Sequence, residues 1–162
     1  MNIDALDAGP ELDTLIAEQL FGHVWMQHAP HQVSLSDDGQ PYRFLVSPEW
    51  IAGLGDDPSW VVVPADMTRK IVYQESTPRY STDISAAWQV CQVMEARGWW
   101  CQMRTPFDTS TQTHRYRYYA GFTPHKTTGW NGTPDHWTPA PSLPLAICRA
   151  ALKANARSED EQ

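Results

Sequence analysis

The sequence predicts an α+β fold with mainly antiparallel strands. Three segments with helical periodicity alternate with two groups of short β-favouring runs, so the order along the chain is helix, sheet, helix, sheet, helix. The chain has 162 residues and is 41% hydrophobic, which is enough for one sizeable core. We therefore expect a single domain over residues 1–156, followed by a charged tail over residues 157–162.

The first helix is predicted to end at Gly22. Pro10 stands where a first helical turn tolerates proline, and the residues of an apolar stripe follow it: Leu12, Leu15, Ile16, Gln19 and Leu20. After this helix, four β-favouring runs are separated by turn-forming Asp, Gly and Pro: residues 32–35, 42–47, 60–63 and 70–73. These runs are typical of an antiparallel meander, with one long irregular excursion over residues 48–59.

The second helix is predicted between a cap at residues 81–83 and a stop at Gly98. The Ser-Thr-Asp trio offers side-chain oxygens to the free N–H groups of a first turn, and glycine adopts the left-handed conformation easily. Apolar residues recur between these signals at steps of three and four: Ile84, Ala87, Trp88, Cys91 and Met94. A third helix is expected after Ser142, with Pro144 in its first turn and with this stripe: Leu143, Ile147, Ala150 and Ala154.

Residues 99–104 and 113–122 are predicted to form a β-hairpin through residues 106–112. Apolar and polar residues alternate in both runs, so one face is apolar and the other carries arginines. Residues 97–126 contain five Lys or Arg side chains and one Asp, whereas the whole chain has a net charge of −7. A compact basic region on an acidic protein suits a small anion, and the overall charge disfavours long nucleic acid as a partner.

Two stretches of the chain resemble the phage ABA sandwich domain family. They are residues 80–88 with the following Arg97-Gly98-Trp99, and residues 144–154 in the last predicted helix. The first helix is similar too, and the resemblance covers about half of the chain. It implies a small phage or prophage protein with a three-layer α/β/α sandwich, from a family without a generally established biochemical role. Relative to that family pattern, residues 48–59 and 123–141 are expected to be inserted loops.

The cysteines and the hydropathy indicate the compartment. The three cysteines show no CxxC spacing and are expected to be core residues in a reducing cytoplasm: Cys91, Cys101 and Cys148. No basic segment followed by an apolar run begins the chain, and no run reaches the ~20 apolar residues of a membrane span. We expect a cytoplasmic protein with no membrane partner.

Aromatic and basic side chains define a candidate ligand site. Eight tryptophans and six tyrosines exceed what a core of this size needs. Trp88 and Trp99 are assigned to the core, because they lie on apolar stripes. The candidate site combines rings that stack on bases, basic groups that bind phosphates, and one amide: Trp100, Arg104, Arg115, Arg117, Tyr119, Lys126, Trp130, Asn131 and Trp137. Three interpretations of the loop over residues 123–141 remain open: a lid or binding loop, a surface loop held by its tryptophans, or a disordered excursion.

No catalytic signature accompanies these residues. The chain contains no G-x-S-x-G, no P-loop and no G-x-G-x-x-G. Two groups of possible metal ligands match no familiar spacing: His23, His28 and His31, and His125, Asp135 and His136. We expect no catalytic residue, no metal and no cofactor.

Three functional classes are compatible with these features. The preferred prediction is a phage-encoded, non-catalytic binding protein that sequesters a small nucleotide-derived immune signal, as an anti-defence sponge. The second class is a protein-binding inhibitor or adaptor of a host factor, in which the same rings form the interface. The third is a nucleotide-degrading enzyme that uses His114, His125 or His136 as acid or base. Surplus aromatic residues also predict a homo-oligomer, a dimer or higher.

Overall fold

The computed structural model describes residues 2–29, 42–63, 77–105, 118–125 and 137–160. Its elements follow in chain order: η1 (Ile3–Ala5), α1 (Pro10–Phe21), β1 (Val24–His28), β2 (Arg43–Val46), α2 (Pro48–Leu54), β3 (Trp60–Val62), α3 (Ile84–Ala96), β4 (Trp99–Arg104), β5 (Tyr118–Pro124), β6 (Thr138–Ala140) and α4 (Leu143–Asp160). The predicted strands at residues 32–35 and 70–73 and the predicted turn at 106–112 lie outside the described residues.

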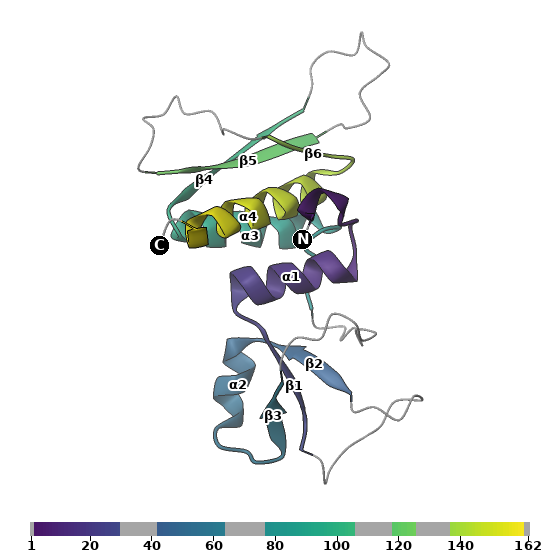
Figure 1. Cartoon of the computed structure of the whole chain (residues 1–162), viewed down its shortest axis with the longest axis vertical. Coiled ribbons are helices and arrows are strands. Elements are labelled where there is room, and N and C mark those ends of the chain that lie inside the picture. The colour runs from purple at the N-terminus through teal and green to yellow at the C-terminus, as the bar shows by residue number, and fades with distance from the viewer. Residues whose placement is uncertain (1, 30–41, 64–76, 106–117, 126–136, 161–162) are drawn as a thin grey trace.

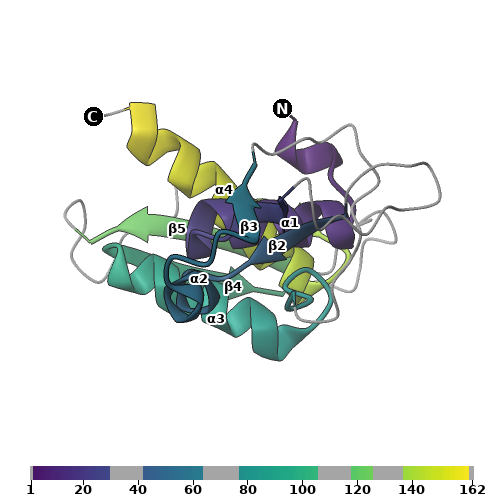
Figure 2. The same cartoon turned by 90° about the horizontal axis from the view of Figure 1, so that it is seen from below.

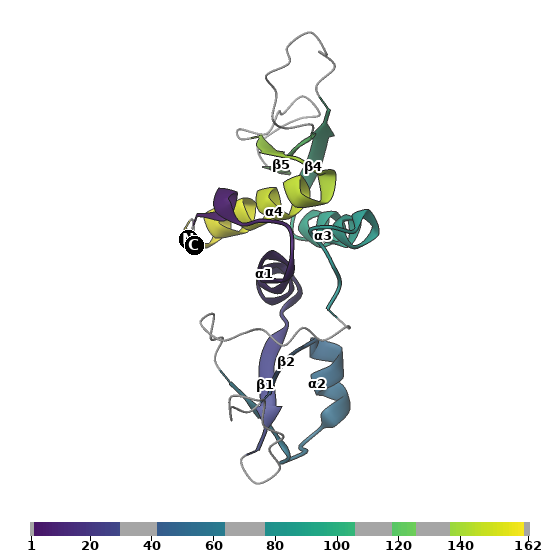
Figure 3. The same cartoon turned by 90° about the vertical axis from the view of Figure 1, so that its right-hand side faces the viewer.

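The predicted α+β class with antiparallel strands is confirmed. The described strands form two antiparallel sheets, with the orders β2-β1-β3 and β4-β5-β6. Figures 1 and 3 show α1, α3 and α4 stacked between these two sheets, with α2 beside the first sheet at the far end of the molecule. Figure 2, which looks along the long axis, shows that α3 and α4 run in different directions across α1. The layers are therefore helices in the middle and a sheet at either end.

The core lies where α1, α3 and α4 meet. The side chains that fill it are almost fully buried and come from all three helices: Leu12, Ile16, Val90, Met94, Ile147 and Leu152. The same hydrophobic cluster contains Trp25 and Leu45 of the first sheet and Ala120 and Phe122 of the second. The apolar residues of the predicted stripes on α1 and α4 are thus confirmed in or against the core, and so is the placing of the three cysteines. Gln19, also assigned to the α1 stripe, is exposed instead.

Two residues of the apolar stripe predicted for α3 lie outside the core. Trp88 is 52% exposed and Ile84, one turn before it, is 48% exposed. The buried face of α3 consists of Ala86, Ala87, Val90, Cys91 and Met94. Trp88 follows Ala87 by one position, which rotates its side chain by about 100° away from the centre of that face. The small side chains of the two alanines face the core instead.

The irregular excursion predicted over residues 48–59 is also wrong in part, because it contains helix α2. The backbone N–H of Trp50 donates to the Ser47 hydroxyl at 3.3 Å, which caps the helix. Pro48 occupies the first helical position, where its missing N–H is no loss. These are ordinary helix-start signals, but the helix has only seven residues and contains Gly53, so no periodicity reveals it.

Two strands and the end of α4 were not predicted. β1, at Val24–His28, is the central strand of the first sheet. β6, at Thr138–Ala140, pairs with β5 and lies inside the segment expected to be an inserted loop over residues 123–141. Residues 157–160, expected in the charged tail, continue α4.

The Glu18 side chain supplies a test of the contact between α1 and β1. The indole Nε1–H of Trp25 donates to the Glu18 carboxyl. Burial raises the pKa of Glu18, and the bond from Trp25 opposes that shift. A raised pKa means that the folded state holds the proton of Glu18 more tightly than the unfolded state does. The stability that comes from this tighter proton binding is complete below pH ~4.5 and is lost as pH rises through the pKa of the folded state.

We therefore expect Glu18→Gln to keep or slightly raise the melting temperature at pH 7, because the amide oxygen still accepts from Trp25 and no charge is desolvated. Glu18→Ala leaves the indole N–H without its acceptor and should cost about 1–2 kcal/mol. Calorimetry from pH 4 to 8 checks this. A Gln variant as unstable as the Ala variant contradicts it.

Candidate functional site

The outer face of the second sheet carries the predicted site residues that the structure describes. Antiparallel pairing places Trp100 opposite Thr123, Gln102 opposite Gly121 and Arg104 opposite Tyr119. Trp99, Cys101 and Met103, which alternate with them on β4, pack against the helical core. The residues of these three cross-strand pairs therefore project from the side of the sheet that faces away from α3 and α4.

The Arg104 guanidinium contacts two aromatic rings of the predicted site. Its Cζ atom lies 4.3 Å from the centroid of the Trp137 ring and 5.1 Å from that of the Tyr119 ring. Both distances are in the range of cation–π contacts. The structure thus brings together three residues that the sequence placed in one site, from β4, β5 and the residue before β6.

Among the described residues, the N–H edge of this guanidinium has no partner. Arg104 is exposed, and no described carboxylate forms an ion pair or hydrogen bond with it. Contacts to aromatic rings use the faces of the guanidinium, whereas its five N–H donors lie in the plane. The rings restrict the long side chain, so a phosphate or carboxylate that binds the N–H edge meets a donor group with reduced freedom.

A second pair of rings lies at the other end of β4. The rings of Trp100 and His125 are 4.4 Å apart between centroids, and Trp100 is 47% exposed. Arg104 follows Trp100 by four positions on the strand, which corresponds to a rise of about 13 Å. Next to Trp100, Thr123 is buried, and its Oγ1 has no hydrogen-bond partner in the described structure. This face therefore offers a stacking surface and a guanidinium at two positions along one strand.

The other predicted site residues cannot be placed on this face. Arg115, Arg117, Lys126, Trp130 and Asn131 lie outside the described residues, so their part in the site stays a prediction. The same holds for His114 and His136, two of the three histidines considered as acid or base. Within the described ranges, no three His, Cys, Asp or Glu side chains gather as metal ligands.

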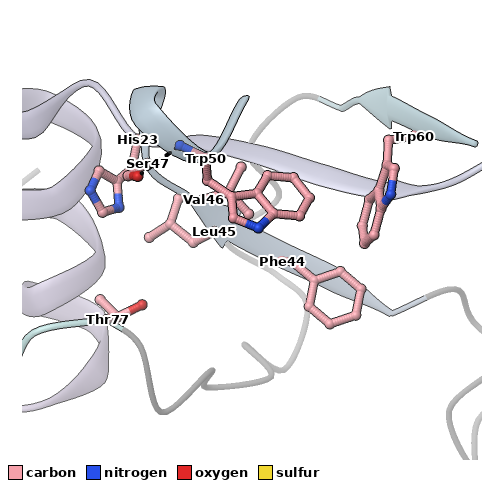
Figure 4. Close-up of a pocket in the computed structure, with 8 residues that line it drawn as sticks. All are labelled: His23, Phe44, Leu45, Val46, Ser47, Trp50, Trp60 and Thr77. Atoms are coloured by element: carbon pink, nitrogen blue, oxygen red, sulfur yellow. Dashed lines mark hydrogen bonds between the residues drawn. The ribbon is translucent and has the colours of Figure 1, made fainter. Parts of the chain in front are cut away.

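A cavity that the sequence did not predict lies in the first sheet. It has a volume of about 320 Å³, and its walls come from β2, α2, β3 and the residues that follow α1 and precede α3. Figure 4 shows the rings of Phe44, Trp50 and Trp60 along it and His23 with Thr77 at the opposite end. A signal for it existed: the Ser47-Pro48-Glu49 helix start places Trp50 in a first turn beside the strand.

Comparison with protein-family models, with curated proteins and with solved structures finds no match to this chain. The likeness to the phage ABA sandwich family therefore rests on the quoted stretches of sequence. In the part of the chain that the structure describes, no helix combines the length and the apolar character needed to cross a membrane.

Proposed function

We propose that this protein is a non-catalytic binding protein that sequesters a small, nucleotide-derived immune signal in the cytoplasm of a phage-infected bacterium. The observation that carries the proposal is the Arg104 guanidinium, held against Trp137 and Tyr119 with its N–H edge unpaired among the described residues. The phage setting comes from the sequence resemblance, and the anionic, planar ligand comes from the chemistry of the site.

Each part of such a ligand has a counterpart on the sheet. A phosphate accepts charge-assisted hydrogen bonds from the Arg104 fork. A base stacks on an aromatic face such as Trp100 for about 1–3 kcal/mol. The predicted partners Arg115, Arg117, Lys126, Trp130 and Asn131 would add charge, stacking area and a polar contact. None of these contacts requires an acid, a base or a nucleophile, so the ligand leaves the site unchanged.

Titration calorimetry with cyclic nucleotides, cyclic dinucleotides and ADP-ribose derivatives tests this function. We expect one of these ligands to bind and to be recovered unaltered after denaturation. Arg104→Gln should raise its Kd about 30- to 150-fold, which corresponds to a loss of about 2–3 kcal/mol. Arg104→Lys should bind almost as weakly, because it keeps the charge and loses the planar fork.

The matched control is Arg157→Gln, which removes the same charge from an exposed arginine in α4. This variant should bind within about twofold of the unchanged protein, as expected for a solvated charge. Equal losses in the two Gln variants would show that only net charge matters and would remove Arg104 from the site. Recovery of a chemically altered ligand would favour the nucleotide-degrading class instead.

The exposed apolar pair on α3 favours a second candidate function, a protein-binding inhibitor or adaptor. Ile84 and Trp88 stand one helical turn apart and are both about half exposed. Tryptophan is enriched among the residues that dominate binding energy at interfaces. The same pair also suits the predicted homo-oligomer. Loss of a partner, or of self-association, in Trp88→Ala with ligand binding intact would separate this surface from the nucleotide site.

A further inference from the structure

The cavity in the first sheet has a wall of interlocked aromatic rings. The Trp50 and Trp60 rings are 5.1 Å apart between centroids at an interplanar angle of 86°. The Phe44 and Trp60 rings are 5.6 Å apart at 71°, and the His28 ring lies 3.9 Å from that of Trp60. Edge-to-face contacts of this kind hold each ring in place. A ligand that packs on this wall therefore orders few side chains when it binds.

The opposite end of the cavity is polar. The Nδ1 atom of His23 is buried and has no hydrogen-bond partner in the described structure. Thr77 is buried at the same end, and Figure 4 shows its side chain and that of His23 at one extremity of the cavity. A buried polar atom without a partner is unfavourable, so a ligand group that bonds to this imidazole gains from the contact.

The charges around the cavity favour a neutral ligand. Among the residues that the structure describes, no Lys or Arg lines it, and the charge that acts on His23 is the carboxylate of Glu49 in the first turn of α2. Burial lowers the pKa of His23, and the Glu49 carboxylate opposes that shift. At neutral pH the imidazole is then uncharged, with one nitrogen that donates and one that accepts. An anion would meet no cation among the described lining residues and would face an acidic side chain.

We propose that this cavity is a second binding site, for a neutral, flat heteroaromatic molecule whose ring packs on Trp50, Trp60 and Phe44 and whose polar edge bonds to His23. A volume of about 320 Å³ lies at the lower end of ligand pockets in general, which fits a fused-ring compound of modest size. This site is separate from the Arg104 face in position and in charge, so it stands independently of the proposed function.

Nuclear magnetic resonance of the full chain tests the proposal with two named probes, adenine and indole. We expect both, at millimolar concentration, to shift the indole N–H resonances of Trp50 and Trp60 and to leave that of Trp88 in place. Trp50→Ala should weaken binding of both probes at least tenfold. Trp50 is 40% exposed on a short helix, so this variant is expected to fold.

The matched control is Trp88→Ala, which removes a partly exposed indole outside the cavity and should leave binding unchanged. His23→Phe tests the polar contact separately from the shape of the cavity. It should weaken binding of adenine about tenfold, and binding of toluene, a third probe without a polar edge, less than twofold. Arg104→Gln should bind both probes normally. If neither probe shifts the Trp50 and Trp60 resonances, or if Trp50→Ala and Trp88→Ala bind alike, the cavity is not a binding site of this kind.

Discussion

Replacing Tyr80 by alanine is expected to lower the free energy of unfolding by about 3–5 kcal/mol, the usual loss for a large buried ring. Tyr80 is 2% exposed and lies just before α3. Its ring stacks on that of Phe21, at the end of α1, with centroids 4.8 Å apart and planes at 15°. The substitution therefore removes a contact between the end of α1 and the segment that leads into α3, and it leaves a cavity there. Urea denaturation followed by circular dichroism measures the loss.

The Tyr80 hydroxyl provides a separate readout through pH. Burial, with smaller contributions from Asp13 and Cys148, raises the pKa of Tyr80 to about 12. The unfolded chain loses this proton near pH 10. Between these two values the folded state keeps a proton that the unfolded state has released, so stability should fall as pH rises.

Tyr80→Phe keeps the ring and removes the ionisable group. It should lose much less stability than Tyr80→Ala at pH 7, and the part of the alkaline decline that is due to Tyr80 should disappear. A decline of unchanged steepness in Tyr80→Phe would mean that another group causes it.

The long helices were predictable because several independent signals agree on each. α3 has its cap at Asp83, whose carboxylate accepts from the N–H of Ser85 at 2.8 Å, and it is followed by Gly98 with φ of 88°. Between these signals an apolar stripe specifies the buried face. Even so, the stripe misplaced Trp88. The periodicity does not decide between two overlapping faces of the helix that differ by about one position, and the packing of α3 on α4 buries the face with the alanines.

The short elements were not predictable because their signals conflict. β6 has three residues with Pro139 in the middle, a residue that usually argues against a strand. The sheet tolerates this proline because β6 is an edge strand. The edge position of β6 results from its pairing with β5, which lies outside the stretch of sequence that local signals cover. β1 shows no clean alternation of polar and apolar residues, because the consecutive residues Trp25 and Met26, which point to opposite faces of the sheet, are both buried.

The two candidate sites also differ in how far the sequence alone could predict them. Arg104 and Tyr119 could be grouped from sequence, because alternation along two adjacent strands of one hairpin puts them on one face. The cavity combines His23, Trp50, Trp60 and Thr77, which come from four separate segments. Nothing local in the sequence connects them, because the pairing of β1 with β2 and β3 and the placing of α2 bring them together.

Replacing Asp13 by alanine is the second change with a large expected effect, a loss of about 2–4 kcal/mol in the free energy of unfolding. Asp13 is 1% exposed in the first turn of α1, and its carboxylate accepts from the backbone N–H of Ser81 at 2.6 Å. The Ser81 hydroxyl in turn accepts from the N–H of Gly9 at 2.8 Å. This chain of bonds fastens the start of α1 to the segment that leads into α3.

The expected loss is large because alanine leaves a buried donor unsatisfied. The N–H of Ser81 belongs to a fully buried residue, so no water replaces the carboxylate without a cavity forming. The Asp13 charge also lies near the amino end of α1, where the helix dipole favours a negative group. Urea denaturation at pH 7 measures the change.

Two variants divide this effect into its parts. Asp13→Asn keeps an oxygen acceptor for Ser81 and loses the charge, so it should retain about half of the stability that Asp13→Ala loses. Ser81→Ala keeps the backbone donor to Asp13 and removes only the acceptor for Gly9, so it should cost about 1 kcal/mol. Because the two bonds share Ser81, the double variant Asp13→Ala, Ser81→Ala should lose less than the sum of the single losses. Strict additivity would show that the two bonds act independently and that the N–H of Ser81 finds another partner once the carboxylate is gone.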